Sequence, residues 1–175
     1  MRNTIAPMEI IIRPAFFRAP TDSGKDDAEN VHRLVRALAE VQEAADYVTG
    51  SVDDLRRDGS GPHPYFHAML AERPDGTAVG LALYYFIYST WAGRPKLYVE
   101  DLYVDADLRG TGLGRRLMAA LAREAVAHGC VKLDLSVKTD NAARDFYARL
   151  GLTRSGTWLP YTVAGADLET LAASG

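Results

Sequence analysis

The chain has almost no cysteine and no strong excess of charge of either sign. Cys130 is the only cysteine among 175 residues, so no disulfide can form within the chain, and a reducing cytoplasm is the simplest location. The formal net charge of −3 gives no electrostatic reason to expect a nucleic-acid partner. No apolar run approaches the length that spans a bilayer, and the opening MRNTIAPMEI lacks the pattern of a signal peptide, so we expect no membrane association.

The remaining composition is that of an ordinary globular chain. Hydrophobic residues make up 47% and charged residues 25%, and the length allows a sizeable core without disulfides or metals. We therefore expect a single domain over residues 8–163, an N-terminal extension at 1–7 and a C-terminal tail at 164–175. Met8 could equally be the natural start of the protein.

Hydrophobic periodicity predicts an α/β protein. Apolar residues at helical spacing predict helices over 26–47 and 112–128, and an N-cap at Ser51 predicts a short helix over 53–57. Further segments are predicted as a helix at 141–150 and as strands at 8–14, 65–72, 77–88, 96–104, 131–137 and 157–163. The resulting order, β-α-α-β-β-β-α-β-α-β, predicts a mixed sheet with helices on both faces.

The turn RGTGLG, Arg109 to Gly114, lies between a predicted strand and the strongest predicted helix. N–H groups at a helix start have no intrahelical partner, and the helix dipole adds partial positive charge. Glycine removes the side chains that would keep a ligand away, so this pattern favours a phosphate or pyrophosphate. Arg115 and Arg116 add cations suited to phosphate oxygens.

Other interpretations of this turn fit to different degrees. A Walker A loop needs lysine and a hydroxyl residue after the last glycine, but Arg115 and Arg116 follow Gly114. A dinucleotide fingerprint needs G-x-G-x-x-G, and here the third glycine comes one position early. Asp134 lies where a ribose-binding acid could stand, but the strand hairpin ahead of the turn disfavours that interpretation. On glycine spacing alone, a tight turn without a ligand is the simplest interpretation.

The arginine ahead of the glycines changes this balance. The pattern Arg109-x-x-Gly112-x-Gly114 after a strand resembles the acyl-CoA-binding turn of the GNAT superfamily of N-acyltransferases. The superfamily's central strand and pyrophosphate loop resemble YVEDLYVDADLRGTGLG, and its late helix resembles DNAARDFYARLG. The diamine/polyamine and thialysine N-acetyltransferase branch is similar to YYFIYSTW and to the ending TWLPYTVAGADLETLA. The resemblance covers nearly the whole chain.

The resemblance implies a fold and an activity. The fold is a mixed, mostly antiparallel sheet with a V-shaped splay between the strands at 96–104 and 131–137. The activity is acetyl-CoA-dependent transfer of an acetyl group to a primary amine of a small molecule, a thialysine-like amino acid or a short diamine, by direct attack in a ternary complex. Other acceptors, namely a polyamine, an amino acid, an aminoglycoside-like drug or a protein amine, stay open, as does a non-catalytic acyl-CoA sensor. The resemblance further implies a homodimer whose amine sites draw on both chains.

Acyl transfer to an amine needs a base, because an ammonium group has no lone pair with which to attack. It also needs a hydrogen-bond donor for the oxyanion of the intermediate and an acid for the departing thiolate. The resemblance assigns the base to Glu100, acting through a water, and the acid to Tyr147, which gives a proton to the departing thiolate. Taken alone, Glu100 would be a solvated or paired acid and Tyr147 a packed tyrosine. Asp101 could attract a cationic amine, although in a regular strand it faces the other side of the sheet.

The resemblance also implies binding residues. Backbone N–H groups around Leu102, Tyr103 and Val104, on the splayed strand, would hold the pantetheine arm and the thioester oxygen. The cofactor-binding set is Leu102, Tyr103, Val104, Arg109, Gly110, Thr111, Gly112, Leu113, Gly114, Arg115 and Asn141. Asn141 stands one residue closer to the tyrosine than in the family pattern, so Asp140 could take its place. The substrate-binding set is Gln42, Trp91, Glu100 and Asp101.

Two departures from the family pattern concern the amine. Polyamine-type members carry a Tyr-Glu pair where this chain has Val41-Gln42, and an acid where it has Ser89, so a smaller amine fits better. Trp91 could wall the amine site or simply pack in a surface loop. We expect no metal, because prolines flank His63 and exclude the helix on which it could form a zinc pair with His67.

Overall fold

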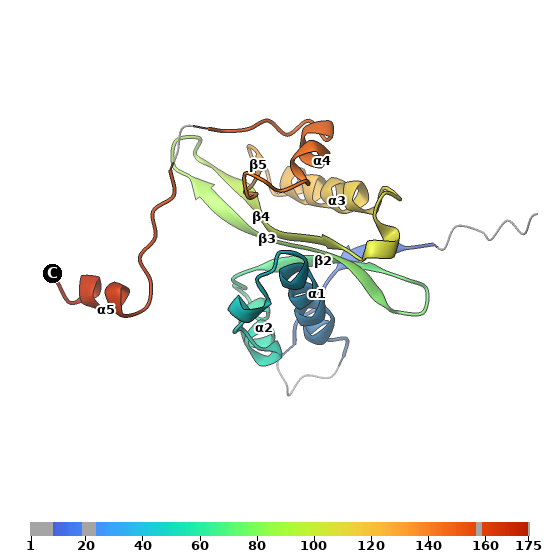
Figure 1. Ribbon diagram of the computed structural model, residues 1–175, viewed down its shortest axis with the longest axis horizontal. Coiled ribbons are helices and arrows are strands. Elements are labelled where there is room, and N and C mark those ends of the chain that lie inside the picture. Colours follow the sequence, from blue (N-terminus) through green and yellow to red (C-terminus); the bar gives the residue numbers. More distant parts are fainter. Residues whose placement is uncertain (1–8, 19–23, 157–158, 175) are drawn as a thin grey trace, which may run out of the picture. The chain divides into compact units, whose positions relative to one another are not determined.

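The computed structural model describes residues 9–18, 24–156 and 159–174 (Figure 1). The chain divides into two compact units, Met1–Ser136 and Val137–Gly175. The expectation of a single domain over 8–163 stays a prediction.

A mixed β-sheet forms the centre of the first unit (Figure 1). Its strands are β1 (Ile11–Pro14), β2 (His67–Glu72), β3 (Ala78–Ser89), β4 (Arg94–Val104) and β5 (Leu133–Leu135). They lie side by side in this order, and the pairs from β1 to β4 are antiparallel whereas β5 runs parallel to β4. The prediction of a mixed, mostly antiparallel sheet is confirmed.

Helices cover both faces of this sheet (Figure 1). They are α1 (Ala28–Val41), α2 (Val52–Gly59) and α3 (Leu113–Ala127), with the 3₁₀ helices η1 (Ala45–Tyr47) and η2 (Ala106–Leu108) in the connections. On the face of α1 and α2, Leu34 packs in one buried cluster with Leu81 and Leu83 of β3. On the face of α3, a Cβ added at Gly80 would lie 3.2 Å from Leu117, so helix and strand approach closely there.

The first predicted helix is shorter than its hydrophobic pattern suggested. It was expected to reach residue 47, but it ends at Val41. Glu43 takes a left-handed conformation with φ of 54°, and the Ala44 N–H bonds back to Ala39 at 2.8 Å. The residues beyond Val41 in the predicted span include small alanines that bury little area, so packing does not sustain the helix.

The short second helix is confirmed and extends further than predicted. Ser51 and Asp54 form a reciprocal capping box at its start, with Asp54 N–H donating to Ser51 Oγ at 3.1 Å and Ser51 N–H donating to Asp54 at 2.8 Å. The helix then continues to Gly59 instead of ending at residue 57.

β4 carries a bulge at Glu100. Leu83 of β3 pairs with Asp101, and the next residue of β3, Tyr84, pairs with Val99, so Glu100 has no partner on β3. The regular alternation that would place the two acids on opposite faces is broken here. Since directly paired residues share a face, Asp101 lies on the α1 face with Leu83.

Pairing between β4 and β5 stops just before this bulge. It covers Leu97 to Val99 of β4 and the 3 residues of β5, fewer than the predicted strand at 131–137. Among the residues that the structure describes, none forms a strand paired with β4 on its β5 side from Glu100 to Val104. The described part of β4 beyond Val99 is thus unpaired on the side where the splay of the fold is expected.

The second unit contains α4 (Arg144–Arg149) and α5 (Ala166–Ala172). α4 confirms the predicted helix at 141–150 in a shorter form, and α5 extends the tail's weak helical pattern. The predicted strand at 157–163 is wrong for 159–163, where the described chain forms no strand; residues 157–158 lie outside the described residues. A strand requires a neighbour for its backbone groups, and the described residues of this unit supply none.

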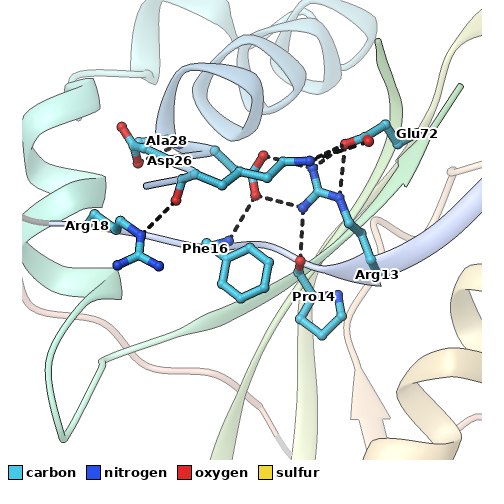
Figure 2. Close-up of polar contacts among 9 residues, drawn as sticks. Arg13, Pro14, Phe16, Arg18, Asp26, Ala28 and Glu72 are labelled. Atoms are coloured by element: carbon cyan, nitrogen blue, oxygen red, sulfur yellow. Dashed lines mark hydrogen bonds and ion pairs between the residues drawn. The ribbon is translucent and has the colours of Figure 1, made fainter. Parts of the chain in front are cut away.

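A buried ion-pair network joins β1, β2 and the start of α1 (Figure 2). Arg13 donates to the two carboxylate oxygens of Asp27 at 2.7 and 2.9 Å and to Glu72 at 2.9 Å. Asp27 is fully buried and also accepts from the Phe16 N–H at 2.9 Å. Burial by itself would raise the pKa of Asp27, but the hydrogen bonds from Arg13 and Phe16 outweigh it, and the pKa is lowered.

Replacing Asp27 with alanine is expected to lower the free energy of unfolding by about 3–5 kcal/mol at pH 7, because Arg13 loses its buried partner. The folded-state pKa of Asp27 is depressed, so its contribution is present above the unfolded pKa of about 4 and is lost as the pH falls below it. Urea unfolding at pH 7 and pH 3 measures both effects. The control is Asp53→Ala, which removes an exposed partner of Arg56 and should cost less than about 1 kcal/mol. Equal costs for the two variants would contradict the role of the network.

Candidate active site

The glycine turn after β4 presents bare backbone to open space. Gly110 and Gly112 have φ of 78° and 88°, in the left-handed region that favours glycine. A Cβ built at either position has no heavy atom of the protein within 4 Å. The turn is therefore not closed over by its own chain, and a ligand can approach its backbone.

The N–H groups at the start of α3 are unpaired. The Arg116 N–H makes a bond to Gly112 O, at 3.1 Å. Among the described residues, the N–H groups of Gly112, Leu113, Gly114 and Arg115 have no acceptor. Together with the dipole of a helix of 15 residues, they form a site for an anion.

Arg109 and Arg115 carry charge that no carboxylate of the described chain neutralises. The guanidinium of Arg109 lies 5.8 Å from the ring centre of Tyr103, and its Nε donates to Val104 O at 3.1 Å. Arg115 is exposed on the first turn of α3. Arg116 differs from them, because it donates to a main-chain oxygen just ahead of β1. Two arginines of the three thus remain for a phosphate.

Thr111 and Leu113 hold the turn in place. The Thr111 hydroxyl donates to Leu108 O at 2.7 Å and closes the turn on itself. The Leu113 side chain is 2% exposed and anchors the helix start in the core. Neither side chain is directed to a ligand by these contacts, so both residues can serve a ligand mainly through their backbone.

Two carboxylates lie next to each other on β4, at its unpaired edge. Glu100 is exposed and accepts a hydrogen bond from the Tyr85 hydroxyl at 2.9 Å. Burial, and then the negative charge of Glu100, raises the pKa of Asp101 to about 6. No cation of the described chain pairs with either acid. The pair can therefore attract an ammonium group and accept its proton.

Tyr147 and Asn141 lie in the second unit. Tyr147 is half-buried on α4, its ring meets Phe146 edge to face at 5.1 Å, and burial raises its pKa, so the phenol stays protonated. Asn141 Oδ1 accepts the Ala143 N–H at 2.8 Å and shapes the approach to α4. Asp140 is exposed and makes no side-chain hydrogen bond within the described chain.

The model of the acetyltransferase (GNAT) family matches residues 31–152. The chain belongs to the GNAT acetyltransferase family. The thialysine N-epsilon-acetyltransferases of Sus scrofa and Bos taurus are each 38% identical to it over 86% of this chain and 95% of their own. A human spermidine/spermine N(1)-acetyltransferase-like protein 1 is 33% identical over 71% of this chain, which matches 19% of that protein. The chain is therefore an N-acetyltransferase.

Solved structures share the fold of this GNAT acetyltransferase. An integron cassette protein from the mobile metagenome of V. cholerae superposes with a TM-score of 0.72 at 25% identity, over 96% of this chain and 100% of its own. An aminoglycoside acetyltransferase from an uncultured soil sample has a TM-score of 0.70 at 19% identity, over 89% and 97%. The second likeness shows the fold alone.

The expected site residues of this GNAT acetyltransferase are not all gathered in one place. Trp91 is 90% exposed at the tip of the β3–β4 hairpin, where Ser89 pairs with Arg94. Six register steps separate that pair from the pair of Leu83 and Asp101, which is about 20 Å along the strands. Trp91 therefore does not reach the Asp101 of its own chain.

The other residues of the first unit that were expected to bind substrate or cofactor lie at the end of α1 and on β4. Gln42 is the exposed residue that follows α1, and its side chain makes no hydrogen bond within the described chain. Leu102, Tyr103 and Val104 lie on the part of β4 that has no β5 partner in the first unit. Among the described residues, no three His, Cys, Asp or Glu side chains gather as metal ligands would. In the part of the chain that the structure describes, no helix is long and apolar enough to cross a membrane.

Sequence reasoning missed Tyr85. Counting back from the hairpin turn pairs Tyr85 with Tyr98, and Glu100 then follows on the diagonal of the same face. That count was the available signal for a contact between Tyr85 and Glu100. No pattern in the sequence predicted that Asp101 lies on this face of the sheet, because its position depends on the bulge at Glu100.

Replacing Asp101 with asparagine is expected to stabilise the protein by about 3 kcal/mol at pH 7.5 and by almost nothing at pH 3.5. The folded pKa of Asp101 is raised, so the stability linked to its protonated form is full below the unfolded pKa and is lost as the pH rises through about 6. Urea unfolding at the two pH values measures the difference. Asp46→Asn, at an exposed position, is the control and should change stability at neither pH by more than about 0.5 kcal/mol. A destabilised Asp101→Asn variant at pH 7.5 would contradict the interpretation that burial and the charge of Glu100 disfavour the ionised form of Asp101.

Proposed function

We propose that this GNAT acetyltransferase transfers the acetyl group of acetyl-CoA to the primary amine of a small molecule, a thialysine-like amino acid or a short diamine, by direct attack in a ternary complex. One observation carries the proposal. An open glycine turn with unpaired N–H groups follows, after the short helix η2, a strand that bears two carboxylates without cationic partners in the described chain, Glu100 and Asp101. The first feature suits an anionic cofactor and the second suits a cationic acceptor.

The turn fits the diphosphate of coenzyme A. No anionic group of the described chain accepts a hydrogen bond from its N–H groups at 112–115. The same holds for the guanidinium of Arg109. The unpaired edge of β4 at 102–104 suits the amide-bearing pantetheine arm, and Asn141 or Asp140 would add a contact from the second unit. The bound coenzyme would supply an acetyl thioester. Gly110 and Gly112 leave room for the approach because neither has a side chain.

Glu100 and Asp101 would prepare the amine. An ammonium group keeps its proton at neutral pH and cannot attack until a base removes it. Glu100 would act as that base through a water, and its exposure gives water access. Asp101 would attract the cation from beside it on the same face, and a pKa near 6 makes this carboxylate a competent proton acceptor at neutral pH.

Tyr147 would act as the acid. Its pKa is raised by burial, so the hydroxyl holds a proton throughout the neutral range and can give it to a departing thiolate. The phenol then recovers a proton from solvent. This assignment completes the division of roles between carboxylates that accept a proton and a phenol that donates one.

The acceptor is inferred from relatives and from two departures. The relatives at 38% identity are named for thialysine, whose side chain ends in a primary amine. Val41-Gln42 and Ser89 replace the acids that the polyamine-type pattern carries, so a long polycation has fewer negative partners here. The aminoglycoside acetyltransferases among the solved structures are too distant to favour their own substrate class.

A homodimer is part of this proposal. Trp91 lies about 20 Å along the strands from Asp101 of its own chain, so an amine site walled by Trp91 requires the tryptophan of a second copy. In the second unit, Leu159, Leu168 and Leu171 are 78%, 51% and 59% exposed, an apolar set that a partner chain could cover. A reducing cytoplasm suits the single cysteine, Cys130.

A thiol-release assay with acetyl-CoA tests the acceptor. Across thialysine, lysine, putrescine, spermidine and free amino acids, kcat/KM is expected to be at least about tenfold higher for thialysine or a short diamine than for spermidine. Glu100→Gln is expected to lower kcat/KM for the best acceptor about 100-fold, because the base is lost. A preference for spermidine would overturn the substrate class. Failure to bind coenzyme A in a calorimeter would overturn the acetyl-transfer proposal itself.

Tyr147→Phe tests the acid. The variant is expected to keep its affinity for coenzyme A and to lose about 100-fold in kcat, because only the hydroxyl is removed. Calorimetry and thiol release measure the two quantities. Tyr161→Phe, at a position 92% exposed in the same unit, is the control and should keep its kcat. Full activity in Tyr147→Phe would refute the acid role, and binding of acetyl-CoA without turnover in the wild type would indicate an acyl-CoA sensor.

A further inference from the structure

The Tyr85 hydroxyl makes a cross-strand hydrogen bond to the carboxylate of Glu100. Its length is 2.9 Å, and Oε2 is the oxygen that accepts. Tyr85 lies on β3 and Glu100 is the bulged residue of β4, so the bond spans the one place where the ladder between these strands slips. The other carboxylate oxygen, Oε1, has no partner within the described chain.

The Tyr85 ring is itself held. It stacks on Tyr98 of β4 with the ring centres 5.3 Å apart and the planes at 29°. The Tyr98 hydroxyl donates to Ser136 Oγ, just beyond β5, at 2.9 Å. Three neighbouring segments of the first unit therefore fix the ring from which the bond to Glu100 is made.

The hydrogen bond does more for the carboxylate than for the fold. Glu100 is exposed, and no cation of the described chain pairs with it, so neither burial nor an ion pair would otherwise fix its side chain. A glutamate with three rotatable bonds samples many positions in water. The bond from Tyr85 holds one oxygen and leaves the other directed to a ligand or a water.

We propose that Tyr85 is a positioning residue, which holds Glu100 Oε2 so that Oε1 meets the incoming amine or the water that serves it. The inference rests on the proposed function, in which Glu100 is the base. Burial and the bond to Glu100 raise the pKa of Tyr85 to about 12, so the phenol remains a hydrogen-bond donor over the working pH range. A fixed base is worth more to catalysis than a mobile one, because misplacement by about 1 Å can cost up to about 100-fold in rate.

Tyr85→Phe removes the hydroxyl and keeps the stacked ring. We expect kcat/KM for the amine to fall about tenfold while KM for acetyl-CoA is unchanged, because the loss concerns only the base. The unfolding midpoint should stay within about 3 °C of the wild type. Tyr88→Phe, an exposed tyrosine of the same strand, is the matched control and should keep the wild-type kcat/KM.

A double-mutant cycle with Glu100→Ala separates positioning from a general structural loss. If Tyr85 acts through Glu100, adding Tyr85→Phe to Glu100→Ala changes kcat/KM less than about twofold. If Tyr85 only supports the fold, the tenfold loss recurs in the double variant, and the inference is overturned. Full activity of the single variant overturns it as well.

The proposed function fails on different evidence. It fails if the wild type releases no thiol from acetyl-CoA with any amine, or if Glu100→Ala is as active as the wild type. If the wild type is active and the Glu100→Ala variant is inactive, the proposed function holds, and the Tyr85→Phe variant then tests only the positioning role of Tyr85. The two ideas are thus distinguished within one set of variants.

Discussion

The end of the pairing between β4 and β5 is the constraint on which the candidate site depends. Pairing between β4 and β5 ends at Val99, and the bulge at Glu100 follows at once. Among the described residues, the strand keeps a partner on one side only from that point, so its other edge offers backbone groups to a ligand. The same bulge brings Asp101 to the face of the sheet that Leu83 shares, beside Glu100. A regular strand paired on both sides would offer neither the free edge nor the pair of acids.

A site made of unpaired polar groups needs a rigid frame around it. Leu113 and Leu117 bury the inner side of α3, which holds the free N–H groups of its first turn in a constant direction. On the opposite face, the Arg13–Asp27–Glu72 network ties two strands to the first long helix through bonds that are largely shielded from water. These contacts compensate for the polar groups that the site leaves open.

The fold explains less of the substrate than of the cofactor. Structures at 17–25% identity with the same fold include proteins named as aminoglycoside acetyltransferases and one named as a ribosomal-protein-alanine N-acetyltransferase. What such proteins share with this chain is its architecture, and an architecture alone does not set the choice of amine. The membership in the GNAT family therefore establishes an acetyltransferase, and the amine is a matter of local chemistry.

The sequence by itself determined the element order as far as α4, the helix that begins within RGTGLG and the mixed sheet, because hydrophobic period and glycine position act locally along the chain. It also pointed to Glu100 through a motif. Only the tertiary structure decided where β5 stops, that β4 slips at Glu100, that Tyr85 holds that carboxylate, and that 159–163 is no strand in a single chain. These features depend on which backbone groups find a hydrogen-bond partner across the sheet. Such partners come from segments that are distant along the chain, so a local sequence pattern does not specify them.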